Sequence, residues 1–159
     1  MQLIASSIFI TGSTGFVGQN LISFFNKIYQ FNCYKRNSEL FIKEEIVIHL
    51  AGKAHDLKKT SNPKEYYQVN TELTKTVFDA FLASGAKVFI ILSSVKAVAD
   101  EVEVVLTEEH TPNPITYYGK SKLLAEQYIL SKEIPEGKRV YILRPCMIHG
   151  PANKGNLNL

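Results

Sequence analysis

A glycine-rich turn near the amino end is the feature that most limits how this chain can fold. The apolar run Ile8–Ile10 is followed by glycines at positions 12, 15 and 18. Apolar residues then recur at helical spacing, as Leu21, Ile22, Phe24, Phe25 and Ile28. A short apolar run bounded by glycine predicts a buried strand, and the later spacing predicts a helix that begins at Phe16.

The same turn is typical of dinucleotide binding. Glycine allows unusual backbone angles, and it lets a pyrophosphate approach the main chain where a Cβ would collide. The helix that follows presents free N–H groups and the positive end of its dipole to the phosphates. The spacing Gly-x-x-Gly-x-x-Gly differs from the commoner Gly-x-Gly-x-x-Gly. Its position directly after the first strand is what favours the dinucleotide interpretation.

Tyr118 and Lys122 are four residues apart, so they leave the same face of a helix about one turn apart. Bringing a phenol from a pKa of about 10 to near 7 requires roughly 4 kcal/mol. One positive charge about 4 Å away supplies about that much at an effective dielectric near 20. The pair therefore predicts a tyrosine that can act as a base. On spacing alone, a packed tyrosine beside a solvated lysine stays an alternative.

Two serines end a second apolar run, Val88–Leu92. In doubly wound sheets ligands bind beyond the carboxyl ends of the strands, which is where Ser93 and Ser94 fall. Ser94 could exchange a hydrogen bond with a substrate oxygen beside the Tyr118 phenol. The alternative is that both serines cap the following turn.

Together these segments resemble the short-chain dehydrogenase/reductase superfamily, in the extended branch called the NAD-dependent epimerase/dehydratase family, which acts on nucleotide sugars. The matching segments are Thr11–Gly18, Ile48–Gly52, Val69–Asn70, Leu92–Ser94, Pro114–Lys122 with Ala125–Glu126, Leu143–Pro145 and Gly150–Pro151. They cover nearly the whole chain in the family's order. Ser93–Lys96 and Lys154–Asn156 are most similar to members that reduce or epimerise sugars of the UDP-N-acetyl-hexosamine type.

The resemblance implies a role for each matching residue. Tyr118 would be the general acid/base, Lys122 would lower its pKa and hold the nicotinamide ribose, and Ser94 would bond the reacting sugar oxygen. As Tyr118 moves the proton of a sugar hydroxyl, hydride would pass between that carbon and the nicotinamide. The implied cofactor-binding residues are Gly12, Ser13, Thr14, Gly15, Phe16, Val17, Gly18, Leu50, Ala51, Gly52, Asn70, Lys122 and Pro145. Asn70 would brace the neighbouring backbone.

Lys35 and Arg36 depart from the family pattern. They follow the predicted second strand, Asn32–Tyr34, where an acidic residue usually grips the ribose 2′-hydroxyl. Basic residues there could pair with a 2′-phosphate, which favours NADP over NAD as the cofactor. A solvated strand end stays the alternative.

Two further departures concern the sheet and the reaction. The stretch 37–45 is too short for the strand and helix that the family usually places there, so the sheet could lack one strand. Val95 and Lys96 stand where the family's dehydratases carry an acidic pair, which argues against dehydration.

The whole pattern alternates strands and helices, which predicts an α/β fold. We expect a Rossmann-like, doubly wound, mostly parallel sheet with helices on both faces. The expected strands are 8–10, 32–34, 47–50, 88–92 and 140–143, and the expected helices begin at Phe16 or span 63–83 and 116–130. At 159 residues, 45% of them hydrophobic, residues 1–159 would form one NAD(P)-binding Rossmann domain. The family's carboxy-terminal substrate-binding part is expected to be absent from this chain.

Composition excludes several classes of function. A net charge of +3, evenly scattered, does not favour nucleic acid. No stretch approaches the roughly 18 apolar residues that a membrane helix needs. Neither the four histidines nor the two cysteines have metal-ligand spacing, and few cysteines fit a reducing, cytoplasmic location.

The leading hypothesis is an NAD(P)-dependent epimerase or 4-keto reductase/dehydrogenase that acts on a nucleotide sugar. The alternative is a non-catalytic dinucleotide-binding module that serves as a redox sensor or scaffold. The resemblance also implies a homodimer that pairs through the helices 63–83 and 116–130.

Overall fold

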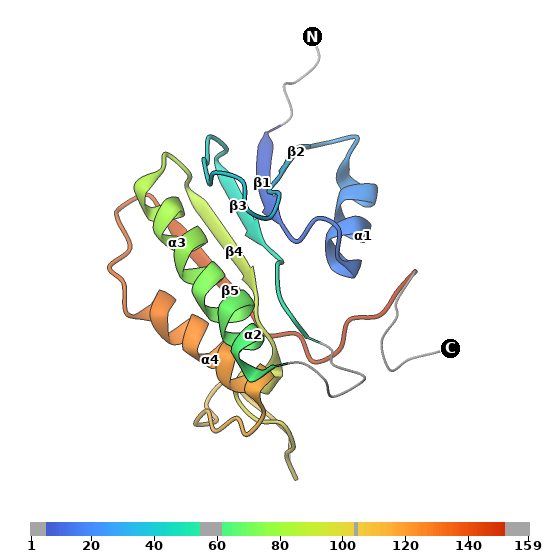
Figure 1. Ribbon diagram of the computed structural model, residues 1–159, viewed down its shortest axis with the longest axis vertical. Helices are drawn as coiled ribbons and strands as arrows, with labels where there is room; N and C mark the ends of the chain where they lie inside the picture. The colour runs from blue at the N-terminus through green and yellow to red at the C-terminus, as the bar shows by residue number, and fades with distance from the viewer. Residues whose placement is uncertain (1–5, 55–61, 104, 152–159) are drawn as a thin grey trace.

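A single parallel sheet forms the centre of the protein. The computed structural model describes residues 6–54, 62–103 and 105–151. The strands are β1 (Ser7–Thr11), β2 (Gln30–Cys33), β3 (Ile46–His49), β4 (Val88–Leu92) and β5 (Arg139–Leu143). They pair in parallel in the order β2-β1-β3-β4-β5 (Figure 1). The strand order reverses between β1 and β3, which is where open α/β sheets bind ligands.

Helices lie on both faces of this sheet, as the sequence predicts. The helical elements are α1 (Phe16–Phe25), α2 (Pro63–Tyr66), a π-helical stretch η1 (Tyr67–Glu72), α3 (Leu73–Ala83), a 3-10 turn η2 (Val95–Ala97) and α4 (Tyr117–Leu130). Successive residues of each strand point to opposite faces of the sheet, so the hydrophobic core has two parts. Phe9, Phe89 and their neighbours pack with α3 and α4, whereas Ile8, Ile10 and Ile48 pack with α1. This confirms the expected Rossmann-like architecture.

No strand or helix lies between β2 and β3, although all of residues 34–45 are described. The expected loss of one strand is therefore confirmed. In the connecting segment, the Ile42 side chain is buried in the core cluster that contains Phe9 and Phe89. Tyr34 and Leu40 pack against the same cluster. Glu44 is buried and accepts a hydrogen bond from Asn32 of β2 across 3.0 Å.

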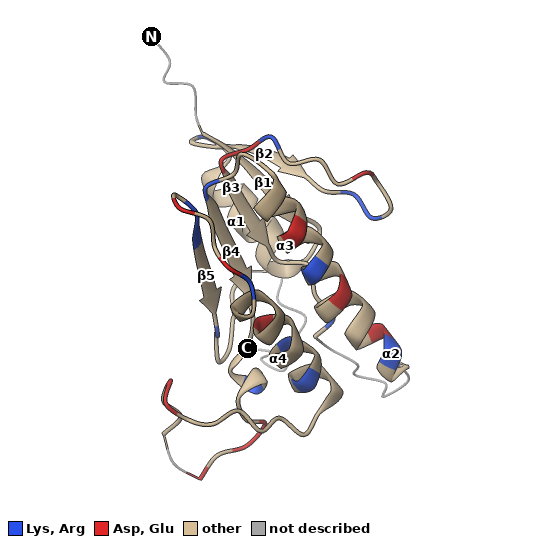
Figure 2. Ribbon diagram, turned by 90° about the vertical axis from the view of Figure 1, so that its left-hand side faces the viewer, with Lys and Arg blue, Asp and Glu red and all other residues tan. Residues whose placement is uncertain are grey.

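Charges of both signs are interspersed on α3 and α4 in Figure 2. Among the described residues, the structure contains no helix that is long and apolar enough to span a membrane.

Candidate functional site

The glycine turn is shaped by its contact with the end of β3. Gly12 has a φ of 73°, and a Cβ placed on it would lie 2.6 Å from the nitrogen of Ala51 and from the carbonyl carbon of Leu50. A Cβ on Gly18 would collide with the carbonyl oxygen of Gly12. Glycine is therefore required at both positions by the protein's own packing, in addition to the expected approach of a pyrophosphate.

Asn70 braces the backbone around it, as expected, from within η1. Its Oδ1 accepts a hydrogen bond from the Lys53 N–H across 2.7 Å, and its Nδ2 donates to the Lys53 carbonyl and to Ser121 Oγ at 3.0 and 2.9 Å. Both amide hydrogens are thus used within the protein. Asn70 connects the segment after β3 to α4, and π-helical stretches of this kind are frequent at functional sites.

Hydrogen bonds of the residues around Thr116 fix the start of α4. Thr116 caps the helix by accepting a bond from the Gly119 N–H across 3.0 Å. Asp100 in turn accepts bonds from the N–H groups of Ile115 and Thr116 and from the Thr116 hydroxyl, at 2.8, 3.0 and 2.7 Å. The sequence reasoning missed this support, because Asp100 is distant in sequence and shows no pattern of its own.

Ser94, Tyr118 and Lys122 come together beyond the carboxyl end of β4. Burial raises the pKa of Tyr118, and a hydrogen bond with Ser94 opposes that rise. The Lys122 ammonium donates to the carbonyl oxygen of Leu92 across 2.9 Å. Burial lowers the pKa of Lys122 to about 8, against the opposing effect of the Glu126 carboxylate. Ser94 is thus the group whose effect on the pKa of Tyr118 opposes that of burial.

The capping alternative for the serine pair holds for Ser94. Its Oγ accepts a bond from the Lys96 N–H across 3.2 Å and caps η2, while the same side chain bonds Tyr118. Ser93 has a different partner, because its hydroxyl donates to the buried carboxylate of Glu126.

Gly52 joins the two halves of the site. A Cβ on Gly52 would lie 3.2 Å from the Lys122 ammonium nitrogen and 3.3 Å from Asn70 Oδ1. The segment Leu50–Gly52 therefore touches the glycine turn at one end and Lys122 at the other.

The chain after β5 returns across this edge of the sheet to α1 (Figure 1). The Val95 N–H donates to the Pro145 carbonyl across 3.2 Å, which places Pro145 beside η2. At the far end, Asn20 Nδ2 donates to the Pro151 carbonyl across 3.2 Å. A Cβ on Gly150 would lie 3.7 Å from the Phe16 ring. Pro145 and Phe16, predicted from separate motifs, thus border the same edge.

Lys35 and Arg36 are exposed at the rim of the site. The Tyr34 N–H donates to the Ile10 carbonyl across 2.9 Å, and Ile10 pairs with Cys33. This register brings Lys35 level with Gly12 at the carboxyl edge of the sheet. Both a contact to a cofactor phosphate and a solvated strand end agree with that position.

The remaining predicted positions follow from these elements. Ser13, Thr14, Gly15 and Val17 belong to the turn and the first residues of α1, and Lys154–Asn156 lies outside the described residues. No cluster of histidine, cysteine or acidic residues that could hold a metal ion occurs among the described residues.

Comparison with known proteins agrees with this arrangement. The chain is 30% identical to a UDP-glucose 4-epimerase from Vibrio cholerae, over 94% of this chain and 54% of that protein. It is 34% identical to N-acetyl-alpha-D-glucosaminyl-diphospho-ditrans,octacis-undecaprenol 4-epimerase from Escherichia coli O157:H7, over 72% of this chain and 34% of that protein. Among solved structures, RMD from Pseudomonas aeruginosa complexed with NADPH superposes with a TM-score of 0.77 and 27% identity, covering 96% of this chain and 58% of RMD.

The chain therefore spans about half the length of the first of these relatives. The family described as "NAD dependent epimerase/dehydratase family" matches this chain over residues 8–158, which is nearly the whole sequence. With the parallel sheet and the glycine turn in place, we conclude that this chain belongs to the NAD-dependent epimerase/dehydratase family.

Proposed function

We propose that residues 1–159 form the NAD(P)-binding Rossmann domain of an enzyme that epimerises a nucleotide sugar or reduces its 4-keto form. The observation that carries this proposal is the placement of Ser94, Tyr118 and the buried Lys122 ammonium beyond the carboxyl end of β4. This group lies at the sheet edge that also holds the glycine turn. A tyrosine that only packed against its neighbours would not need a hydroxyl partner and a buried cation at that edge.

The residues fit a dinucleotide. Glycine at positions 12 and 18 lets the turn pack against its own backbone and the end of β3, and the helix N-terminus that follows would present main-chain N–H groups to a pyrophosphate. Lys122 would hold the nicotinamide ribose, and Pro145 would border the nicotinamide. The bound nicotinamide would supply or accept the hydride.

Tyr118 would handle the proton at the sugar hydroxyl. Because burial raises its pKa, the phenol keeps its proton at neutral pH, which suits a proton donor to a keto oxygen. Ser94 would hold the same sugar oxygen. In the oxidising direction, the Tyr118 phenolate would accept the proton of the sugar hydroxyl, and Ser94 and the Lys122 charge would stabilise that phenolate.

For the cofactor, we propose NAD or NADP, with NADP favoured. Lys35 and Arg36 supply two positive charges level with the glycine turn, where a 2′-phosphate would pair with them. RMD was solved with NADPH, whereas other similar structures contain NAD, so the preference for NADP rests on Lys35 and Arg36.

For the substrate, we propose a sugar of the UDP-N-acetyl-hexosamine type. The sequence Ser93–Lys96 is the motif that favours it, and the relative from Escherichia coli is named for an N-acetylglucosaminyl substrate.

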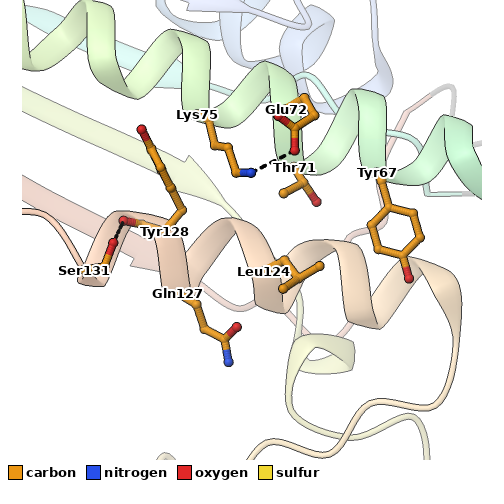
Figure 3. A pocket seen from close by; sticks show the side chains of 8 residues that line it. All are labelled: Tyr67, Thr71, Glu72, Lys75, Leu124, Gln127, Tyr128 and Ser131. Atoms are coloured by element: carbon orange, nitrogen blue, oxygen red, sulfur yellow. Dashed lines mark hydrogen bonds and ion pairs between the residues drawn. The ribbon is translucent and has the colours of Figure 1, made fainter.

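We further propose that two copies pair through α3 and α4. Figure 3 shows a shallow groove between η1, α3 and α4, lined among others by Tyr67, Thr71 and Leu124. Leu124 is 44% exposed, although it lies in the middle of a helix. A second copy would cover this apolar side chain.

A titration of the chain with NADH and NADPH, followed by cofactor fluorescence, tests the proposal. We expect binding of both, tighter for NADPH. The protein that contains this chain should then interconvert the 4-epimers of a UDP-N-acetyl-hexosamine or reduce the 4-keto sugar. A chain that binds neither cofactor would contradict the proposed domain, and binding without any turnover would favour the sensor or scaffold alternative.

A further inference from the structure

Glu126 is a buried carboxylate that joins three elements. Its side chain is 1% exposed, and it lies one turn after Lys122 on α4. Arg144, which directly follows β5, donates from Nε to both carboxylate oxygens at 3.1 Å and from Nη2 to Oε2 at 2.5 Å. Ser93, which directly follows β4, donates its hydroxyl to Oε1. When one guanidinium donates several bonds to one carboxylate, the orientation of the two side chains is fixed as well as their separation.

Each partner in this network is next to a residue of the proposed site. Ser93 precedes Ser94, Arg144 precedes Pro145, and Glu126 follows Lys122 by one helical turn. Backbone bonds reinforce the contact between the two strand ends. The Ser93 N–H donates to the Leu143 carbonyl across 2.7 Å, and the Val95 N–H donates to Pro145 across 3.2 Å.

The carboxylate also acts on the charge of Lys122. Burial lowers the pKa of Lys122, whereas Glu126 raises it and so keeps more of the ammonium form near neutral pH. The other titratable groups around Lys122 are Tyr118 on the same helix, Arg144 across Glu126, and His49 on β3. His49 interacts with Lys122 electrostatically, and its own pKa is lowered to about 3, so it is neutral at physiological pH.

From these contacts we propose that Glu126 and Arg144 are a positioning pair, which holds the ends of β4 and β5 against α4 and thereby aligns Ser94, Pro145 and the charged Lys122. The inference rests on the proposed function, because it assigns the pair to the same site. A purely structural ion pair would stabilise the fold without setting the charge of Lys122 or the affinity for cofactor.

The test replaces Glu126 with glutamine, which keeps the shape and removes the charge. Glu45→Gln is the matched control, because it removes the carboxylate of the exposed Glu45–Lys87 pair at the opposite end of the strands. The side-chain resonance of Lys122, identified by its loss in Lys122→Met, is followed by NMR through a pH titration of the lysine-labelled chain. NADPH affinity at pH 7 is measured by fluorescence on the same samples.

We expect the Lys122 pKa in Glu126→Gln to fall below the wild-type value of about 8, and NADPH to bind about threefold or more weakly. Glu45→Gln should match the wild type in both measurements. An unchanged Lys122 pKa with unchanged affinity would overturn the inference. If the wild type binds neither NADPH nor NADH, the proposed function fails, while the Lys122 titration still decides whether the pair acts on that charge.

If Glu126→Gln does not fold, Arg144→Lys replaces it in the experiment. This variant keeps the positive charge and loses the fork, so we expect the Lys122 pKa to stay near that of the wild type while NADPH binds more weakly. Affinity equal to that of the wild type would then overturn the inference.

Discussion

The hydroxyl of Thr11, at the end of β1, donates a hydrogen bond to Nδ1 of His49, at the end of β3, across 2.7 Å. The neighbouring bonds fix this direction. Thr11 Oγ1 already accepts from the Ala51 N–H, and Thr74 donates its own proton to the Asn70 carbonyl, so it must accept from His49 Nε2 across 2.9 Å. His49 is therefore a neutral ring with its proton on Nε2, buried between Thr11 of β1 and Thr74 of α3.

Acid should destabilise the fold through His49. Burial lowers the pKa of His49 to about 3, whereas the unfolded residue titrates near 6.5. Below about pH 6.5 the unfolded state binds a proton that the folded state does not, so stability falls as pH falls, by about 2 to 3 kcal/mol at pH 4.5. Urea unfolding of the wild type and His49→Gln between pH 7 and 4.5 measures this, with the exposed His149→Gln as control. Equal pH slopes in the wild type and His49→Gln would contradict it.

Gly12→Ala should destabilise the protein by several kcal/mol. The added Cβ would lie 2.6 Å from the backbone of Leu50 and Ala51. Residue 12 also has a positive φ that residues with a side chain rarely adopt. Gly85→Ala is the matched control, because a Cβ there meets nothing within 4 Å. The measurement is the urea midpoint of each variant. A Gly12→Ala protein as stable as Gly85→Ala would show that the turn can shift away from β3.

The fold could be predicted well from the sequence, because its signals are local. The strand Val88–Leu92 has the expected bounds, and α4 begins one residue after the expected start. The helix expected over residues 63–83 is instead α2, η1 and α3 in succession. Its π-helical stretch could not be foreseen, because no local sequence signal marks it, and Asn70 within it bonds Lys53 and Ser121, which are distant in sequence.

The site could be predicted less completely. Sequence spacing predicts which residues form the proposed catalytic group, but it does not predict the hydrogen-bond partner of each residue. Helical spacing places Lys122 near Tyr118, yet burial and the Leu92 carbonyl decide where its ammonium lies. Glu126 shows one usable signal, since it lies four residues after Lys122 and must share its face. Arg144 shows none, because its contact with Glu126 exists only after the sheet has formed.

Tyr118→Phe should abolish turnover of the protein that contains this chain and leave cofactor binding nearly unchanged. The change removes the proposed proton donor, which contributes about 10² to 10⁴ in rate, and keeps the half-buried aromatic ring. Steady-state kinetics and cofactor titration measure the two effects separately. Tyr117→Phe, at the exposed neighbouring tyrosine, is the control. Turnover that survives in Tyr118→Phe would refute the proposed mechanism.

Replacing Lys35 and Arg36 with serine should weaken NADPH binding about tenfold or more while NADH binding stays the same. The two side chains would lose their charge-assisted bonds to the 2′-phosphate, a group that NADH lacks. Lys27→Ser, at an exposed position just after α1, is the control for general loss of charge. No loss for either cofactor would indicate a solvated strand end, and equal loss for both would contradict a contact specific to the 2′-phosphate.

Leu124→Glu should convert a dimer into monomers. The charge would enter the groove between α3 and α4, where we propose that the second copy packs. Light scattering coupled to size-exclusion chromatography measures the mass. Leu130→Glu, on the same helix but outside the groove and 71% exposed, should stay dimeric. A monomeric wild type at all concentrations would disprove the pairing.

The short connection between β2 and β3 has a consequence for how long a cofactor would stay bound. β2 is at one edge of the sheet that the described residues form, so we expect an adenine beyond its carboxyl end to stay more accessible to water than one flanked by a further strand. Less buried area favours faster dissociation. A nucleotide that exchanges with the surrounding pool between turnovers behaves as a second substrate. That suits a reductase, which consumes one reducing equivalent per cycle, better than an epimerase, which returns the same hydride to its sugar.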